Sequence, residues 1–177
     1  MNRYSLVTIS AATALGLALL AGNAVAQQKT LKDQLAGTWS LASITTTRPD
    51  GTKSDSFGSN PKGAVSFENN GRLSFIITAS NLPPFASKER TTGTADENKT
   101  VVQGSIAYFG TYMVDEADKS YTTRVEGSTF PNWTGLAQKR MVVISGNDLT
   151  ITNPAGSGVA PLNPSGHESQ QRLRTKS

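Results

Sequence analysis

The chain has 177 residues, a single histidine, no cysteine and a formal net charge of +4. The absence of cysteine excludes disulfides and lipid attachment at a cysteine, and one histidine with scattered carboxylates matches no transition-metal or calcium spacing. The basic residues form no stripe interleaved with stacking aromatics, so we expect no nucleic-acid partner, no metal and no cofactor.

The N-terminus has the pattern of an export signal. Arg3 precedes an apolar stretch, and Ala24-Val25-Ala26 places small residues at the alternate positions that signal peptidase requires. The apolar stretch is shorter than the ~20 residues of a membrane-spanning helix, which is the competing interpretation. We therefore expect residues 1–26 to be a signal peptide cleaved after Ala26. Residues 27–177 would then form one periplasmic or secreted domain with no integral membrane segment, large enough to bury its own core.

The first predicted elements of that domain are a short helix and a strand. Thr30 can cap a helix of one or two turns that reaches Ala36. In LAGTWSLASI, Trp39 and Leu41 alternate with polar neighbours, which predicts a strand. Gly37 would let the backbone turn in tightly before this strand, and Trp39 would be a large packed side chain on it. Both residues are predicted to be structural.

Two hairpins are the clearest local predictions. In AVSFENNGRLSFIIT, residues 64–78, apolar residues alternate on both sides of Asn70-Gly71, a pair typical of a type I′ turn. A second hairpin turns at Gly146-Asn147-Asp148. The remaining predicted elements are a short loop helix over 95–103, strands over 106–114, 120–127, 136–145 and 149–152, and a polar last strand over 167–175.

These segments add up to about eight mostly antiparallel strands, joined largely by hairpins. An open sheet of that size exposes two edges, and closure into an up-and-down barrel removes them. Eight strands enclose an interior that side chains either fill or share with one small ligand. The predicted fold class is therefore all-β: an eight-stranded antiparallel up-and-down barrel with a short N-terminal helix and one short helix in a loop.

Several pieces of the sequence together resemble the bacterial lipocalin-like domain family, a calycin-type barrel. These pieces are LAGTWSL, KGAVSFENNGRLSF, AYFGTYMVD, PNWTG and KRMVVISGNDLTIT, and they keep the order and spacing of that family over residues 35–152. The resemblance implies the barrel fold, with the tryptophan of Gly-x-Trp at its closed end, and a cavity for a ligand. It implies no reaction.

Two tyrosines on one predicted strand are candidates for ligand binding. Tyr108 and Tyr112 share parity with Ile106 and Val114, which would place them on the inward face. Phe109 and Met113 take the opposite face, and the pattern leaves open which of the two sets faces inward. A tyrosine inside a small barrel either packs as core or offers its hydroxyl to a ligand.

Arg140, Glu126 and Trp133 complete the candidate site. Arg140 shares parity with Val142 and Ile144, and an arginine inside a barrel is costly unless paired. It would serve either as the partner of a buried acid such as Glu126 or as the anchor of a ligand carboxylate, unless the strand frame is wrong and it is solvated. Trp133 would either line the barrel mouth or close a loop against the barrel exterior.

The residues favour an exported barrel that binds a small lipophilic or aromatic ligand in its interior. An alternative is a cofactor-independent isomerase, dehydratase, cyclase or decarboxylase, in which Glu126 would act with Tyr112 or Tyr121. A third hypothesis is a filled barrel that serves as a protein-interaction module. The single histidine, His167, makes a catalytic triad a weak hypothesis. Ligand identity, catalysis and oligomeric state are not determined by the sequence.

Overall fold

The computed structural model describes residues 29–48, 50–55, 57–153 and 168–175. The predicted export signal, residues 1–26, and His167 lie outside the described residues. Nine strands, two α-helices and one short 3-10 helix make up the described part of the chain. In chain order they are α1 (Leu31–Leu35), β1 (Gly37–Thr47), β2 (Lys53–Ser54), β3 (Lys62–Phe67), β4 (Arg72–Thr78), α2 (Ala95–Gly104), β5 (Ser105–Asp115), β6 (Ser120–Ser128), η1 (Pro131–Trp133), β7 (Ala137–Ser145), β8 (Asp148–Asn153) and β9 (Glu168–Thr175).

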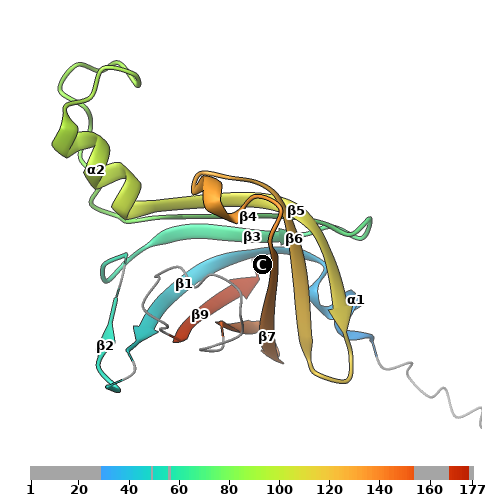
Figure 1. Ribbon diagram of the computed structural model, residues 1–177. Coiled ribbons are helices and arrows are strands. Elements are labelled where there is room, and N and C mark those ends of the chain that lie inside the picture. Colours follow the sequence, from blue (N-terminus) through green and yellow to red (C-terminus); the bar gives the residue numbers. More distant parts are fainter. Residues whose placement is uncertain (1–28, 49, 56, 154–167, 176–177) are drawn as a thin grey trace, which may run out of the picture.

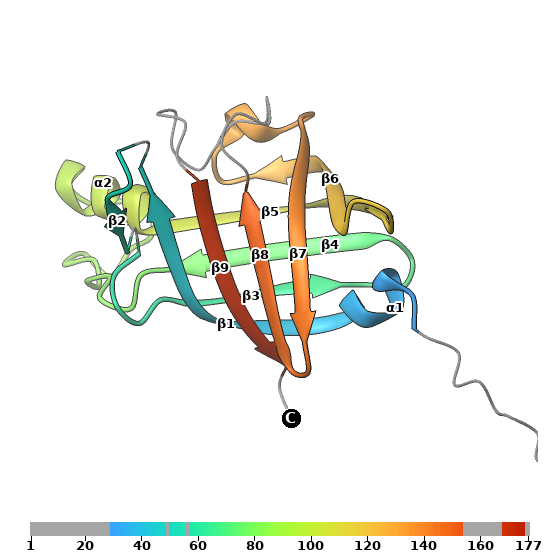
Figure 2. The same ribbon diagram turned by 90° about the horizontal axis from the view of Figure 1, so that it is seen from below.

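Eight of these strands form a closed antiparallel barrel. From β3 to β9 each strand pairs with the next along the chain, β1 pairs with β3, and β9 pairs back with β1, which closes the sheet. The short β2 is an extra strand that pairs with the end of β1. Figures 1 and 2 show the strands wrapping around a common interior. The predicted fold class is confirmed. Closure pairs the backbone groups of the two edge strands that an open sheet would expose.

Helix α1 lies against one end of the barrel and is held there by three kinds of contact. Thr30 and Asp33 form a capping box around its first turn. The Glu116 carboxylate, in the β5–β6 turn, accepts hydrogen bonds from the backbone N–H of Leu31 at 2.8 and 3.0 Å. The indole N–H of Trp39 donates to the carbonyl of Leu35 at 2.8 Å. The last two contacts tie α1 to the β5–β6 turn and to β1, so the helix covers this end of the barrel.

Gly37 links that helix to the first strand. Its φ is 118°, a backbone conformation that residues with a side chain rarely adopt, so glycine is required for the chain to turn from α1 into β1. Two residues later the indole of Trp39 is 3% exposed and belongs to the core. The two residues predicted to be structural thus lie at the junction between α1 and the barrel floor.

The hairpin between β3 and β4 forms where the sequence predicts it, but its turn differs. Gly71 has a φ of 86°, whereas Asn70 is not among the described residues with positive φ. A type I′ turn needs positive φ at both central residues, so the prediction of that turn type was wrong. The hydrogen bond from Gly71 N–H to the Glu68 carbonyl instead closes a four-residue turn with Asn69 and Asn70 at its centre, and the left-handed Gly71 follows it and leads into β4. The predicted β7–β8 hairpin is confirmed.

Helix α2 stands away from the barrel, beyond the ends of β4 and β5 (Figure 1), and has no buried residue. Thr94 and Glu97 form the capping box that defines its start. Among the described helices, none has the length and apolar character that crossing a membrane would need.

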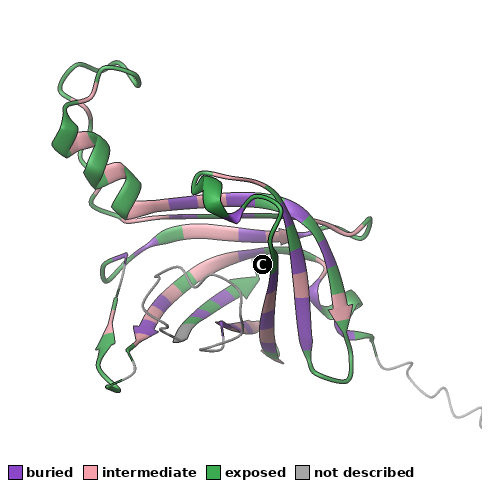
Figure 3. Ribbon diagram, viewed as in Figure 1, coloured by how far each residue is buried: buried purple, intermediate pink, exposed green. Residues whose placement is uncertain are grey.

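Burial alternates along the barrel strands (Figure 3). On β5, Tyr108 and Tyr112 are buried while Phe109 and Met113 are exposed, so the tyrosine set faces inward. This alternation is what a strand with one face on a core and one in water requires.

Candidate functional site

The barrel interior has an apolar wall and a partly polar wall. The apolar wall is formed by strands β3, β4 and β5. Its inward side chains are Val65, Phe67, Leu73, Phe75, Ile77, Ile106, Tyr108 and Tyr112. The opposite wall, from β6 to β9, mixes apolar residues with five buried polar side chains of inward parity. These are Thr123, Gln138, Arg140, Asn153 and Gln171.

The polar side chains lie toward the end of the barrel opposite α1. Gln138 is near the start of β7 and faces Thr123 across the β6–β7 pairing. Asn153 is the last residue of β8. Because successive strands run in opposite directions, the starts of β7 and β9 and the end of β8 share this end of the barrel. The polar cluster is thus separated along the barrel axis from the floor formed by Trp39.

Arg140 is the centre of this polar cluster. It is 4% exposed, and its guanidinium donates to the Gln138 side-chain oxygen at 2.8 Å and to the Asn153 side-chain oxygen at 3.2 Å. A third bond goes to the backbone carbonyl of Lys139 at 2.9 Å. All three acceptors are neutral, and among the described side chains no carboxylate pairs with Arg140. Arg140 therefore faces the barrel interior, together with Gln138 and Val142 on the same strand.

Several buried polar atoms of the barrel have no hydrogen-bond partner within the described part of the chain, and one of them belongs to Gln138, a partner of Arg140. Four of them are the Thr123 hydroxyl, the Trp133 indole nitrogen, the Gln138 side-chain nitrogen and the Gln171 side-chain oxygen. A buried polar group without a partner costs about 1–3 kcal/mol. Buried polar atoms of this kind normally have a partner, which can be an ordered water or a bound ligand, so each of the four can take part in one further hydrogen bond inside the barrel.

Aromatic side chains face this polar cluster. Tyr108 stacks on Phe75 with ring centroids 4.8 Å apart, and Trp133 meets Tyr108 edge-on at 5.7 Å. Trp133 is 1% exposed, so η1 brings its indole among interior side chains and does not leave it on the barrel exterior. Burial raises the pKa of Tyr108, and that of Tyr121 well above its ordinary value, with the Arg140 charge opposing both shifts.

This burial gives a prediction for alkaline pH. Both phenols have a folded-state pKa above the unfolded value of about 10, so folding is supported below that pH and loses support as the pH rises toward the folded pKa. We expect the free energy of unfolding to fall above about pH 10, by up to about 1.4 kcal/mol per pH unit for each tyrosine. Tyr121→Phe should flatten that fall and change little at pH 8, as measured by denaturant unfolding. An unchanged slope in Tyr121→Phe would contradict the assignment.

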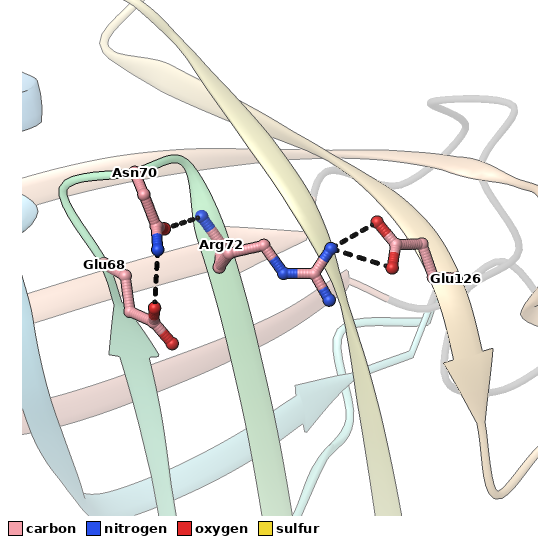
Figure 4. Close-up of polar contacts among 4 residues, drawn as sticks. All are labelled: Glu68, Asn70, Arg72 and Glu126. Carbon is pink, nitrogen blue, oxygen red and sulfur yellow. Dashed lines mark hydrogen bonds and ion pairs between the residues drawn. The ribbon is translucent and has the colours of Figure 1, made fainter.

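Glu126 is not the partner of Arg140. Its carboxylate lies on the outer face of the barrel and accepts from the Arg72 guanidinium at 2.6 and 2.8 Å (Figure 4). The inward residues of β6 are Tyr121, Thr123 and Val125, so strand alternation turns Glu126 outward. Each side chain of the ion pair is 40% exposed, which makes it a screened surface pair. Of the two roles predicted for Arg140, pairing with a buried Glu126 is therefore wrong. The Glu126 carboxylate is also not in the barrel interior, where the enzymatic alternative would need it.

Tyr112 is buried and is the cross-strand partner of Thr123, a member of the polar cluster. Its hydroxyl donates to the Glu68 carbonyl at 3.1 Å, and its ring meets Phe67 edge-on at 5.2 Å. Both partners belong to the end of the barrel near α1. The structure therefore places Tyr108 against Trp133, engages the Tyr112 hydroxyl with a backbone carbonyl and leaves Glu126 on the outer face. Ligand binding by any of these residues stays a prediction.

Four polar residues of the cluster escaped the sequence analysis: Thr123, Gln138, Asn153 and Gln171. Gln138 carried a usable signal, since it shares the parity of Arg140 on the same strand. Asn153 directly follows the strand predicted over 149–152, and Gln171 lies within the polar strand predicted over 167–175. Among the described residues, no group of three or more His, Cys, Asp or Glu side chains could hold a metal ion.

The protein is a closed eight-stranded barrel with a helix and a tryptophan at one end and buried polar groups toward the other. This architecture defines the class of small β-barrel proteins whose interior is either filled by side chains or holds one small ligand. A family model described as a lipocalin-like domain matches residues 36–176. The chain belongs to this lipocalin-like domain family.

One curated relative has a function in its name. The 4'-hydroxy-3'-methoxypropiophenone carrier protein ppsC of Aspergillus oryzae is 35% identical over 107 residues, which cover 57% of this chain and 92% of that protein.

Two solved structures have a similar fold at low identity. A lipocalin-like protein from Bacteroides uniformis aligns with 80% of this chain and 98% of its own, at 15% identity and a TM-score of 0.41. The structure of EF1p2_mFAP2b bound to DFHBI aligns with 84% of this chain and all of its own (100%), at 12% identity and a TM-score of 0.39. Neither likeness carries an argument about ligand or activity.

Proposed function

We propose that this protein is a carrier that holds a small aromatic molecule inside the barrel, with no chemical change to it. The observation that carries the proposal is the set of buried polar atoms without partners, opposite an aromatic wall. A ligand whose ring packs beside Phe75, Tyr108 and Trp133 would satisfy those atoms with its own polar groups. The proposal includes export through residues 1–26.

The curated relative supports the same class of ligand. It is named a carrier of 4'-hydroxy-3'-methoxypropiophenone, an aromatic ketone with a phenol and a methoxy group, and this chain covers most of its length. Such a molecule combines one apolar ring with a few oxygens, which is the combination that the two walls of this barrel would accept. Apolar burial of the ring would supply affinity at roughly 25 cal/mol per Å².

The test uses the two tryptophans, of which Trp39 lies at the closed end of the barrel and Trp133 lies against Tyr108. In Trp39→Phe, the indole of Trp133 becomes the single reporter, and we expect its fluorescence to be quenched by 4'-hydroxy-3'-methoxypropiophenone and related phenols. In Trp133→Phe, the indole of Trp39 lies at the closed end and should respond much less to the same titration.

Native mass spectrometry of the wild-type protein supplies the second arm. A bound ligand that is recovered unchanged after long incubation supports a carrier, whereas a changed ligand would support the enzymatic alternative. Neither quenching nor a mass increment with any member of a panel of phenols, aromatic ketones and fatty acids would overturn ligand binding and favour a filled barrel.

A further inference from the structure

Arg140 is a buried cation whose charge the described part of the protein does not balance. Its three acceptors are two side-chain amides and one backbone carbonyl. Burying a cation without an anion is costly, because neutral dipoles replace its hydration only in part. The acidic side chains that the structure describes lie elsewhere, and Glu126, the nearest candidate on the neighbouring strand, is engaged outside by Arg72.

The neighbouring tyrosines do not supply the missing charge. Burial raises the pKa of Tyr108 and of Tyr121 above the ordinary value of 10.0, so both phenols are neutral at physiological pH. Their rings approach the guanidinium closely enough for its charge to influence both groups. The site therefore stays positive in the protein without ligand.

The groups left without partners around Arg140 are mostly donors. A guanidinium has five N–H groups, and three of them are used here, which leaves Nε and one Nη2 donor without a partner among the described residues. The Gln138 oxygen accepts from Arg140, so its side-chain nitrogen points elsewhere and has no acceptor. The Trp133 indole nitrogen is also a donor without an acceptor, and the Thr123 hydroxyl, opposite Gln138, can donate as well.

We propose that Arg140 and Gln138 form an anion subsite, and that the ligand of this barrel is an aromatic carboxylate whose two oxygens are bound there. This inference rests on the proposed function and narrows its ligand class. A carboxylate offers two acceptor oxygens and one negative charge, which match the free donors and the unbalanced cation. The carbonyl group of a neutral ketone, in the same place, supplies one acceptor oxygen and no charge.

The test compares two ligands of nearly equal shape, 4-hydroxy-3-methoxybenzoate and 4'-hydroxy-3'-methoxyacetophenone. At about pH 6.5 the acid is ionised and the phenols are not. We expect wild-type protein to bind the benzoate at least about 10-fold more tightly, as measured by titration calorimetry. Arg140→Met should weaken the benzoate by about 10–100-fold and change the affinity for the ketone by less than about 3-fold. Arg140→Lys should retain part of the preference, because it keeps the charge without the planar fork.

The matched control is Arg124→Met, which removes an exposed arginine from the outer face of β6. It should leave both affinities at the wild-type value. An unchanged preference in Arg140→Met, or a wild-type protein that prefers the ketone, would overturn the anion subsite. If Arg140→Met does not fold, the wild-type protein alone decides: its affinity for the benzoate should fall as the pH drops through the pKa of the ligand carboxyl, while that for the ketone should not.

The failure of the proposed function gives a different result. Wild-type protein that binds neither aromatic compound contradicts that function, and sodium acetate then tests the subsite by itself. At constant ionic strength, acetate should raise the midpoint of thermal unfolding of the wild type but not of Arg140→Met. If Arg140→Met does not fold, Arg140→Lys replaces it and should show a smaller rise than the wild type. No rise in the wild type contradicts the subsite as well.

Discussion

Trp39→Ala is expected to lower the free energy of unfolding by about 3–5 kcal/mol. The indole is 3% exposed at the barrel floor, and its N–H satisfies the Leu35 carbonyl at the end of α1. Truncation removes that packing and leaves a cavity between α1 and β1. It also leaves a buried carbonyl without its donor. Because α1 has only five residues and is held by contacts at this end, we expect it to detach as well.

Denaturant unfolding followed by circular dichroism measures this effect. Trp39→Phe keeps a ring and loses the hydrogen bond, so it should cost about 1–2 kcal/mol. Met113→Ala is the control, since Met113 is 74% exposed on the outer face of β5 and should change stability by less than about 0.5 kcal/mol. A loss below about 1 kcal/mol in Trp39→Ala would show that the barrel floor does not depend on the indole.

Gly110→Ala is the second large effect that we expect, with a loss of about 3 kcal/mol or a failure to fold. A Cβ at this position would lie 2.0 Å from the backbone carbonyl oxygen of Arg124 on the paired strand β6. The pairing of β5 and β6 shifts register between Phe109 and Gly110, and this irregularity brings the two backbones close. Backbone atoms in a closed barrel cannot move aside without breaking neighbouring strand pairs.

Gly127→Ala is the matched control for that substitution. A Cβ there would also be too close to its neighbour, at 2.6 Å, but the contact is the ring of Phe109, which is 49% exposed and can rotate outward. We expect Gly127→Ala to change stability by less than about 1 kcal/mol. The two variants are compared by their denaturant midpoints. Equal losses in both would indicate that strand propensity, and not the backbone clash, governs these positions.

The fold was predictable because its signals are local. Alternation of apolar and polar residues identifies strands and their inward faces, and the glycines at hairpin turns identify where the chain reverses. Parity grouped Tyr108 with Ile106 and Arg140 with Val142 but left open whether either set faces inward, and the structure buries both. The turn at Asn70-Gly71 was predicted in position and missed in type, since flanking strands select among turns that the same residues can form.

The candidate site was predictable only in part, because it depends on which strands are neighbours. Parity places Glu126 outward as surely as it places Val125 inward, so this error was avoidable from the sequence. The engagement of Tyr112 by the Glu68 carbonyl and the convergence of Gln138 and Asn153 on Arg140 were not predictable. These contacts join residues whose relative heights follow from strand register and barrel stagger.

The sequence by itself determined the all-β barrel and favoured an inward direction for Arg140, because period-two patterning and turn residues act over a few positions of the chain. The place of Trp39 at the barrel floor was implied by the resemblance to the lipocalin-like family. Only the tertiary structure decided that Arg140 meets amides and not a carboxylate, and that its partners lie opposite an aromatic wall. The physical reason is that closure of the barrel sets the distances between strands far apart in sequence, and those distances determine which charges are balanced.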